Sequence, residues 1–557
     1  MSDSLENFLA HHQSLIFEET AAGVKERLFS IRLPAFPEGR EFNKAWLVLP
    51  QGFPQNNRAH IRLSKDAVLR IPHVEDNGKL CLDEGDPGAS SGNATEDRID
   101  VLLREFYFKF CDPWCAGALD GDFSREALNY WTIQVTRTAS KNNPVARIYT
   151  VDAYPTFTRV YQARLLLPGR IVVAGDNPSV ADRFVKSLGA HASQVQNVIV
   201  ADIPISYEFT PSTWPRSEAD LKHLIAARLD AAQHNMFMRQ NPKKRRGKHR
   251  IVLLRAPHCS FGFLMTGGPH TEVNIGRSKH ACPTRQMLHL MVERIDPSWT
   301  CGRDQHPQVQ DRQMRHVLVL GAGALGSPVI DQLAKAGVGR ITVVDPDSLS
   351  SANIGRHLLG AESVWQDKAT ALAQRLSLSN PSTRIDPYVE SAQSWIAQYT
   401  LKEVDVVLDM TGEPDVRWYL EQARQAIPRP LLIAWMEPYV AAAHACLLPA
   451  GERWLRTASD PLKALQAVDW PKDVYQYEPA CSSDFQSYTP AAAAHAVALV
   501  AEAALALIDN QIDKPVVRSW VRGQQFLDMH HIGLVLRKWA IEAAPFDGLS
   551  KERAFDE

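Results

Sequence analysis

The chain has 557 residues, of which 45% are hydrophobic and 22% are charged, and its formal net charge is -2. This length predicts about three domains, and the near-zero charge gives no global reason to expect binding to nucleic acid or to a membrane. The polar start of the chain lacks the basic and apolar regions of a signal peptide. The cysteines are scattered and include no CxxC pair, which predicts neither a disulfide framework nor structural zinc. We therefore expect a cytoplasmic protein.

The predicted elements of the first half of the chain are short. A polar helix begins the sequence, and extended runs such as Leu28–Leu33 follow, with proline-rich turns between them. Farther along, Arg170–Ala174 and Val198–Ala201 are predicted strands on either side of a helix at Ser179–Leu188. The basic segment Gln240–Arg250 is predicted to be a solvated loop, with contact to a phosphate or an acidic partner as the alternative.

One cysteine of this first half lies in a recognisable pattern. The run RIPHVEDNGKLCL contains Pro72, Gly78 and Cys81, and it resembles the active-site stretch of ubiquitin-conjugating enzymes. His73 stands eight residues before Cys81, where that family has an asparagine, and Ile71 replaces the family histidine. The resemblance implies that Cys81 carries an acyl thioester and that His73 donates a hydrogen bond to the oxyanion. A structural cysteine in a turn is the alternative.

A doubly wound α/β pattern begins with the short β-branched run His316–Leu320. The turn that follows contains Gly321, Gly323 and Gly326 and leads into a helical stretch. Glycines let the backbone approach phosphates closely, and a helix N-terminus favours negative charge. Asp345 ends the next predicted strand, where a carboxylate accepts hydrogen bonds from ribose hydroxyls. The turn predicts a nucleotide site but leaves ATP, NAD and an unliganded turn open.

The following segment, VVDPDSLSSANIGRHLLG and then WQDKA, favours ATP. It contains Asp345, Asn353, Arg356 and Lys368, and it resembles the ThiF/MoeB-type adenylating domain of ubiquitin-activating enzymes over about residues 310–450. The two cations supply positive charge for a polyphosphate. The resemblance implies that Asp345 holds the ribose, that the other three residues contact phosphates, and that Arg356 and Lys368 assist adenylation. A surface lysine on an amphipathic helix is the alternative for Lys368.

The family also has a magnesium-binding aspartate after a strand, in a run resembling Asp-x-Thr-Asp. Here Asp409 and Thr411 fit that run, but Gly412 occupies the position of the expected second aspartate and Glu413 follows it. The resemblance therefore implies Mg²⁺ beside the nucleotide, with Asp409 or Glu413 as its ligand.

A second candidate nucleophile follows the adenylating core. Cys481 lies in EPACSSD, a predicted loop, and Thr489 and Pro490 are predicted as the N-cap and first residue of the next helix. A thiolate is suited to take the acyl group of an adenylate, and the position of Cys481 resembles that of the catalytic cysteine in thioester-forming activating enzymes. Cys446 is expected to be buried. Ala491–Ile508 is expected to be a buried or dimer-facing helix rather than a membrane span.

Together these features predict an α/β and α+β multidomain chain. Its expected domains are a ubiquitin-conjugating-like α+β domain at 1–155, a linker domain at 156–300 and a Rossmann-like ThiF-type adenylating domain with a catalytic cysteine at 301–557. This order resembles the bacterial fusion enzymes of CBASS anti-phage operons. The resemblance implies an ATP-dependent enzyme that adenylates the C-terminus of a cyclic-nucleotide synthase, passes it from Cys481 to Cys81 and ligates it to a target amine. Adenylating domains of this type dimerise, so the resemblance also implies a homodimer.

Other functions stay open from the sequence alone. The same chemistry serves for conjugation of a bacterial ubiquitin-like protein, or for adenylation that feeds sulfur transfer without conjugation. A nucleotide-binding scaffold without catalysis and an NAD oxidoreductase are the remaining alternatives. Neither a membrane nor direct nucleic-acid binding is expected.

Overall fold

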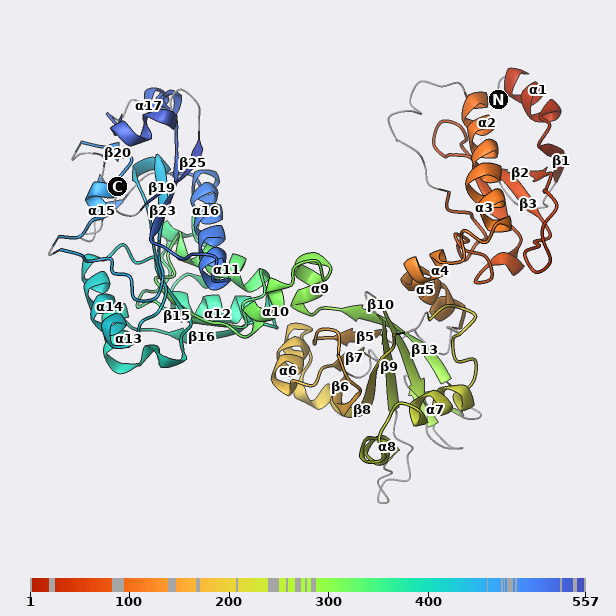
Figure 1. Ribbon diagram of the computed structural model, residues 1–557, viewed down its shortest axis with the longest axis horizontal. Coiled ribbons are helices and arrows are strands. Elements are labelled where there is room, and N and C mark those ends of the chain that lie inside the picture. Colours follow the sequence, from red (N-terminus) through yellow and green to blue (C-terminus); the bar gives the residue numbers. More distant parts are fainter. Residues whose placement is uncertain are drawn as a thin grey trace. The chain divides into compact units, whose positions relative to one another are not determined.

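The computed structural model of the chain divides into two compact units (Figure 1). The first unit is Met1–Tyr149, Tyr154–Ala174 and Gln196–Glu293, and the second is Thr150–Ala153, Gly175–Val195 and Arg294–Glu557. The structure describes residues 3–19, 26–82, 95–138, 147–166, 171–206, 209–238, 250–256, 259–265, 272–275, 278–281, 287–457, 459–471, 474, 476–477, 484–485, 488–530, 533–543 and 548–554.

The N-terminal part of the first unit is a four-stranded antiparallel sheet with helices packed against it. The strands pair in chain order, and their buried side chains, such as Leu47 and Ile61, meet Phe106 in one core. The strands are β1 (Leu15–Glu19), β2 (Arg27–Ile31), β3 (Ala45–Leu49) and β4 (His60–Leu63). The helices are α1 (Asp3–His11), α2 (Thr95–Glu105), the π-helical turn Phe106–Cys111, α3 (Asp112–Cys115), α4 (Asp122–Arg125) and α5 (Ala127–Thr138).

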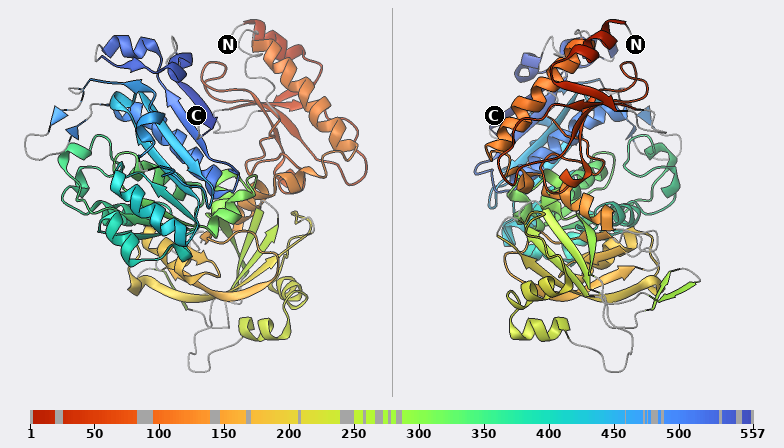
Figure 2. Two further views of the ribbon diagram at one scale, coloured as in Figure 1. Left: turned by 60° about the vertical axis from the view of Figure 1, so that its left-hand side comes forward. Right: turned by 90° about the vertical axis from the view of Figure 1, so that its right-hand side faces the viewer.

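The rest of the first unit is built on a closed barrel, which two further views show from other sides (Figure 2). Its order is β10-β13-β5-β7-β6-β8-β9, and a separate hairpin pairs β11 with β12. The strands are β5 (Arg147–Thr150), β6 (Arg159–Leu166), β7 (Ile171–Ala174), β8 (Val195–Pro204), β9 (Arg250–Ala256), β10 (Cys259–Met265), β11 (Glu272–Ile275), β12 (Ser278–Ala281) and β13 (Met287–Arg294). Helices α7 (Glu218–Ala226) and α8 (Ala231–Met238) accompany them.

One side chain joins the N-terminal part of this unit to its barrel. Trp131 of α5 packs edge-on against Trp214 and Phe261, with ring centroids 5.1 and 5.2 Å apart. Its indole N–H donates to the carbonyl of Leu290 on β13 at 2.9 Å. Because a buried tryptophan needs a partner for its N–H, this bond fixes α5 against the barrel wall.

The strands and helix predicted between Arg170 and Ala201 are present, as β7, β8 and α6 (Pro178–Ser187). The barrel that β7 and β8 help to close did not follow from the sequence, since strand order depends on contacts between distant segments. The predicted loop Gln240–Arg250 lies outside the described residues except for Arg250, the first residue of β9.

The second unit contains a twisted eight-stranded sheet in the order β16-β15-β14-β17-β18-β19-β23-β25. The first five strands are parallel and the last three are antiparallel to their neighbours. They are β14 (His316–Leu320), β15 (Arg340–Val344), β16 (Arg384–Tyr388), β17 (Val406–Asp409), β18 (Leu431–Met436), β19 (Ala442–Leu448), β23 (Val516–Val521) and β25 (Leu549–Ala554). The doubly wound α/β domain predicted from the sequence is therefore confirmed.

Helices cover both faces of this sheet, because side chains alternate along each strand. On β14, Val317 and Val319 pack in one core with α11 (Gly326–Lys335), α12 (Lys368–Ser379) and α16 (Pro490–Ile508). Leu318 and Leu320 pack in the other core with α13 (Ala392–Gln398) and α14 (Pro414–Ala426). Both faces being buried explains why β14 is apolar at every position except His316. Shorter helices are α9 (Pro297–Gly302), α10 (Gln308–Gln313), α15 (Leu462–Leu465) and α17 (Gln524–His530).

Helix α16 is the alanine-rich segment of the sequence. Within the described ranges it is the one helix long and apolar enough to cross a membrane by length and composition, and 67% of its apolar window is buried inside the protein. Its small side chains pack against α11 and β19. Thr489 accepts a hydrogen bond from the N–H of Ala492 at 3.1 Å, which confirms the predicted N-cap.

Candidate functional site

Three glycines shape the turn between β14 and α11, and they are needed for different reasons. Gly321 has φ of +90°, and a Cβ on it would lie 2.9 Å from the carbonyl carbon of Met410. A Cβ on Gly326 would lie 2.1 Å from the carbonyl oxygen of Gly321. A Cβ on Gly323, in contrast, would meet no atom of the described residues within 4 Å. Gly323 therefore leaves open space at the N-terminus of α11, where helix dipole and backbone N–H groups favour an anion.

Side chains hold the peptide groups on both sides of Ala322 inside this turn. Asp345 Oδ2 accepts from Ala322 N at 2.7 Å, and Asp345 Oδ1 accepts from Asp347 N at 2.9 Å. His357 Nε2 lies 2.6 Å from the Ala322 carbonyl oxygen, and His357 Nδ1 accepts from Leu359 N at 3.0 Å. Since Nδ1 accepts, the proton of the neutral ring is on Nε2, which donates to Ala322. The protein's own groups thus fix the turn.

Asp345 and His357 together form what we call the clamp. Burial shifts the pKa of both side chains. Asp345 is 5% exposed and His357 is 9% exposed. Burial raises the pKa of Asp345 above its ordinary value and lowers the pKa of His357 to about 4. His357 is therefore neutral at pH 7, in agreement with its hydrogen bonds. Each oxygen of Asp345 accepts one backbone N–H, and a carboxylate oxygen can accept a second bond, so a ribose hydroxyl fits the same group.

His357 was missed by the sequence reasoning, although it directly follows Arg356 in the motif. A histidine next to a phosphate-binding motif has no distinctive sequence signal. Its role depends on a contact with Ala322, which lies 35 residues earlier in the chain.

The two predicted cations lie in different surroundings. Lys368 is the first residue of α12 and is 8% exposed, and its Nζ donates to Asp347 Oδ2 at 2.8 Å. The surface-lysine alternative is therefore wrong, since a buried lysine needs an anionic partner. The guanidinium of Arg356 lies 5.7 Å from the centre of the Tyr488 ring, a cation–π distance. Burial raises the pKa of Tyr488, so this ring is a neutral partner.

Asn353 serves the local backbone. Its Oδ1 accepts from the N–H and from the hydroxyl of Ser350, both at 3.0 Å. These bonds cap the short 3₁₀ turn Ser351–Asn353 that precedes Arg356. The structure places Asn353 in the loop that carries Arg356 and His357, and its predicted contact with a phosphate stays a prediction.

The end of β17 and the residues after it offer Mg²⁺ single carboxylates rather than a cluster of ligands. Asp409 is 1% exposed; its Oδ1 accepts from the hydroxyl of Thr411 at 2.7 Å, while Oδ2 is buried and accepts no hydrogen bond from any described residue. Burial raises its pKa. Glu413 is exposed at the start of α14. Among the described residues no three His, Cys, Asp or Glu come together as a metal site, but nucleotide-bound Mg²⁺ needs only one or two protein carboxylates.

Gly412, which stands where the family has its second aspartate, adopts a backbone conformation that favours glycine. Its φ is +78°, a left-handed conformation that L side chains rarely adopt. A Cβ at this position would meet no described atom within 4 Å, so backbone strain rather than lack of space disfavours aspartate.

Cys446 and Cys481 both lie in the second unit, but only Cys446 is among the described residues. Cys481 lies outside the described residues, so its proposed role stays a prediction. Cys446 is fully buried on β19, and burial raises the pKa of its thiol. The prediction that Cys446 is buried is therefore confirmed.

Cys81 lies at the end of a tight hairpin in the first unit. Val74 and Leu80 form an antiparallel bridge, and the N–H of Cys81 donates to the carbonyl of His73 at 2.7 Å. A Cβ on Gly78 would lie 2.5 Å from the carbonyl oxygen of Leu63, so the hairpin tip requires glycine. The thiol of Cys81 is exposed. The structure thus brings together His73 and Cys81 as the sequence pattern predicts.

Both ring nitrogens of His73 lie close to carboxylate oxygens, and the predicted role of this residue as an oxyanion donor stays a prediction. Its Nε2 lies 3.0 Å from Asp122 Oδ2, and its Nδ1 lies 2.9 Å from Glu126 Oε1. Neither carboxylate was singled out from the sequence, since they lie on and next to α4, far along the chain.

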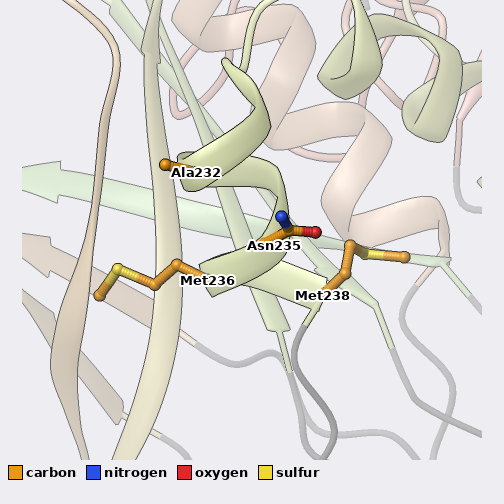
Figure 3. Close-up of a pocket in the computed structure, with 4 residues that line it drawn as sticks. All are labelled: Ala232, Asn235, Met236 and Met238. Carbon is orange, nitrogen blue, oxygen red and sulfur yellow. The ribbon is translucent and has the colours of Figure 1, made fainter.

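A hollow of about 540 Å³ lies elsewhere in the first unit, beside α8 (Figure 3). It is lined by Ala232, Asn235, Met236 and Met238. None of these residues belongs to the predicted sites.

Residues 303–445 match the ThiF family. The chain is 25% identical over 370 residues to the ATP-dependent ubiquitin transferase-like protein Cap2 of Pseudomonas aeruginosa, an alignment that covers 62% of this chain and 64% of that protein. It is 35% identical over 128 residues to the sulfur carrier protein adenylyltransferase of Thermus thermophilus, covering 23% of this chain and 47% of that protein. The chain thus spans less than two thirds of the length of either relative.

Solved structures give a weaker likeness. A structure of E. coli MccB with ATP aligns with 38% of this chain and 61% of that chain, at 15% identity and a TM-score of 0.28. PaaA aligns with 46% of this chain and 70% of that chain, at 14% identity and a TM-score of 0.30. Scores this low carry no argument about this chain, and the fold assignment rests on the strand order of the sheet.

The ThiF match contains the glycine turn, the clamp and both predicted cations, and the Cap2 alignment extends beyond it. These matches confirm the resemblance to a ThiF-type fusion and the enzyme class predicted from the sequence. The chain carries a ThiF-family domain and is similar to the ATP-dependent ubiquitin transferase-like proteins of the Cap2 type.

Proposed function

We propose that this chain adenylates the C-terminal carboxylate of a protein partner with ATP and then transfers it through Cys481 and Cys81 to a target amine. The observation that carries the proposal is the clamped glycine turn, in which Asp345 and His357 fix Ala322 beside the open space at Gly323. It lies within the segment that matches the ThiF family. The similarity to Cap2 supports the extension to a protein partner and a conjugating step.

Adenylation needs little more than positioned charge. The turn and the N-terminus of α11 hold phosphates, Asp345 accepts from the ribose, and Lys368 and Arg356 balance the negative charge, with Asn353 beside them. A carboxylate oxygen of the partner attacks the α-phosphorus, and the bond to pyrophosphate breaks. For Lys368 to contact a phosphate of the bound nucleotide, its hydrogen bond to Asp347 must be replaced by one to that phosphate. Bound Mg²⁺ would supply further positive charge, with Asp409 or Glu413 as its protein ligand.

The remaining steps are acyl transfers. The Cys481 thiolate attacks the acyl carbon and AMP leaves, which gives a thioester. The Cys81 thiolate takes over the acyl group and Cys481 leaves. The target amine then attacks, a C–N bond forms, the C–S bond breaks, and the amine proton ends on the thiol of Cys81.

The resemblance to the CBASS fusion enzymes suggests which partner this is. On that basis the donor is a cyclic-nucleotide synthase in anti-phage defence, and the enzyme acts as a cytoplasmic homodimer. Conjugation of a bacterial ubiquitin-like protein uses the same steps with a different donor. Similarity to a sulfur carrier protein adenylyltransferase keeps adenylation for sulfur transfer as the second candidate.

The test is ATP–pyrophosphate exchange with candidate partners, followed by trapping of the partner on the enzyme under non-reducing conditions. Partner-dependent exchange is expected, and its absence with every candidate would favour a scaffold.

If Cys81→Ala and Cys481→Ala variants conjugate the partner at the normal rate, the relay is wrong. If exchange persists while conjugation never occurs, sulfur transfer becomes the better function. Binding of NAD in preference to ATP would overturn adenylation.

A further inference from the structure

The backbone of His73 is held in a conformation that its surroundings must enforce. Its φ is +63°, in the left-handed region that residues other than glycine rarely adopt. Its N–H donates to the hydroxyl of Tyr130 at 2.7 Å, and its carbonyl accepts from the N–H of Cys81 at 2.7 Å. Tyr130 is fully buried on α5. One residue therefore connects the buried helix to the exposed cysteine.

Both nitrogens of the His73 ring face carboxylate oxygens. Asp122 Oδ2 lies 3.0 Å from Nε2, and Glu126 Oε1 lies 2.9 Å from Nδ1. Both carboxylates are themselves held, because Arg125 donates to Asp122 Oδ1 at 2.9 Å and the Tyr130 hydroxyl donates to Glu126 Oε2. Of these two contacts, the one from Nε2 to Asp122 is a hydrogen bond, in which the ring N–H donates because a carboxylate accepts. The ring is therefore held between two carboxylates by one hydrogen bond and one close contact.

We propose that His73 is a positioning residue, an anchor that fastens the Cys81 hairpin to α4 and α5, rather than the oxyanion donor that the family resemblance implies. Its Nε2–H donates to Asp122 and its Nδ1 lies 2.9 Å from Glu126 Oε1, so both ring nitrogens are taken up by carboxylates rather than by an acyl group on Cys81. The anchor acts through the backbone bond from Cys81 to His73, which fixes the residue that carries the thiol. The proposal rests on the proposed function in one respect, that Cys81 carries an acyl group.

The substitution His73→Asn separates the two roles, because it installs the amide that ubiquitin-conjugating enzymes have at this position. In the full-length protein, Cys81 is charged by transthioesterification from a glycine-ended peptide thioester, in which the Cys81 sulfur attacks the acyl carbon and the small thiol leaves. Free lysine then discharges it. An anchor predicts discharge about tenfold slower in His73→Asn, the loss expected when hydrogen bonds to charged groups are removed. An unchanged or faster discharge would overturn the proposal. Cys81→Ala gives the background from other cysteines.

The carboxylates supply a second test. Asp122→Asn and Glu126→Gln are each expected to slow the discharge, and combining both with His73→Asn is expected to slow it no further than His73→Asn alone, since all three changes break one link. Fully additive losses would contradict a shared anchor. His12→Asn is the matched control, because His12 Nε2 lies 3.2 Å from Asp100 in the same unit, and its discharge rate should equal that of the wild type.

A spectroscopic readout tests the anchor without any catalysis. In histidine-selective ¹⁵N NMR, the wild type should show a His73 ring with a hydrogen-bonded proton on Nε2, a signal that is absent from His73→Asn and changed in the Asp122→Asn/Glu126→Gln double variant. A His73 ring without a proton on Nε2 would overturn the proposal even if conjugation occurs. If no partner is ever adenylated, the proposed function fails while this readout and the peptide-thioester assay still decide the anchor.

Discussion

His357 and His73 each lie beside a site of expected chemistry, but the protein holds them in opposite ways. His357 is 9% exposed, and both its ring nitrogens bond to backbone groups, one as donor and one as acceptor. The side chain of His73 is 23% exposed, and both its nitrogens face carboxylates. The first is a neutral part of the glycine turn, and the second links a hairpin to a helix through carboxylates. The partners that tertiary structure supplies decide what a histidine does.

The two regions also differ in how their backbone is fixed. The turn at Ala322 lies between a central strand and a helix, so regular hydrogen bonding holds both of its ends. The Cys81 hairpin is bonded to β4 by an isolated bridge and backbone hydrogen bonds, such as the one from Leu80 N to the Ile61 carbonyl at 2.9 Å, and side chains of α4 and α5 hold it at His73. Substitutions in the first region should therefore impair nucleotide chemistry alone, and those in the second should impair acyl discharge alone.

The largest expected effect on the first region is at Asp345. Asp345→Asn replaces an acceptor with an amide that cannot accept from both Ala322 N and Asp347 N. We expect ATP–pyrophosphate exchange to fall about a hundredfold, as when a preorganised donor is misplaced, with discharge of Cys81 unchanged. Asp386→Asn is the control, because Asp386 pairs with Arg340 and Arg384 on the same sheet. Equal losses in exchange and discharge would break the separation of the two regions.

His357→Ala should have the next largest effect. It leaves the Ala322 carbonyl without its donor in a buried place, which costs about 1–3 kcal/mol. We expect ATP affinity, measured by titration calorimetry, to fall about tenfold. His357→Gln keeps an N–H donor and should recover most of that loss. If the alanine variant binds ATP as well as the wild type, the clamp does not position the turn.

The same histidine should make the free energy of unfolding depend on pH. Burial lowers the pKa of His357 from 6.5 to about 4. Between these two pH values, His357 binds a proton in the unfolded chain but not in the folded chain. The free energy of unfolding is therefore fully retained above about pH 6.5 and falls as the pH drops toward 4. Urea unfolding across this range should show a shallower decline in His357→Gln than in the wild type. An identical decline would contradict a buried neutral His357.

Gly323→Ala should have a smaller and more selective effect. Its added methyl meets no described atom of the protein within 4 Å, so the melting temperature should stay unchanged while the KM for ATP rises at least about fivefold, as expected for overpacking against a ligand. Gly326→Ala is the contrast, since its Cβ would lie 2.1 Å from the Gly321 carbonyl oxygen and should lower the melting temperature. A normal KM in Gly323→Ala would place the phosphates elsewhere.

The smallest effect is expected at Glu413. This exposed side chain begins α14, and most exposed substitutions change little. Exchange by Glu413→Gln should stay within about twofold of the wild type at saturating Mg²⁺. A large rise in the Mg²⁺ concentration that exchange requires would instead assign the metal to Glu413 rather than Asp409.

The sequence by itself determined the local parts of this protein. The strand, glycine turn and helix around Gly321, the cap at Thr489 and the burial of Cys446 depend on near neighbours in the chain, and the structure has all three. Their physical causes are short-range, namely φ restrictions, capping bonds and apolar periodicity. Residues 303–445, which match the ThiF family, include the glycine turn.

Only the tertiary structure decided which side chains meet across long stretches of chain. His357 reaches Ala322 from 35 residues away, and His73 reaches Asp122 from 49 residues away. The barrel likewise pairs strands that are distant in sequence. No local pattern encodes such contacts, because they depend on how sheets and helices pack. The glycine turn could therefore be predicted from the sequence. The groups that hold it and the groups that hold Cys81 could be identified only in the folded chain.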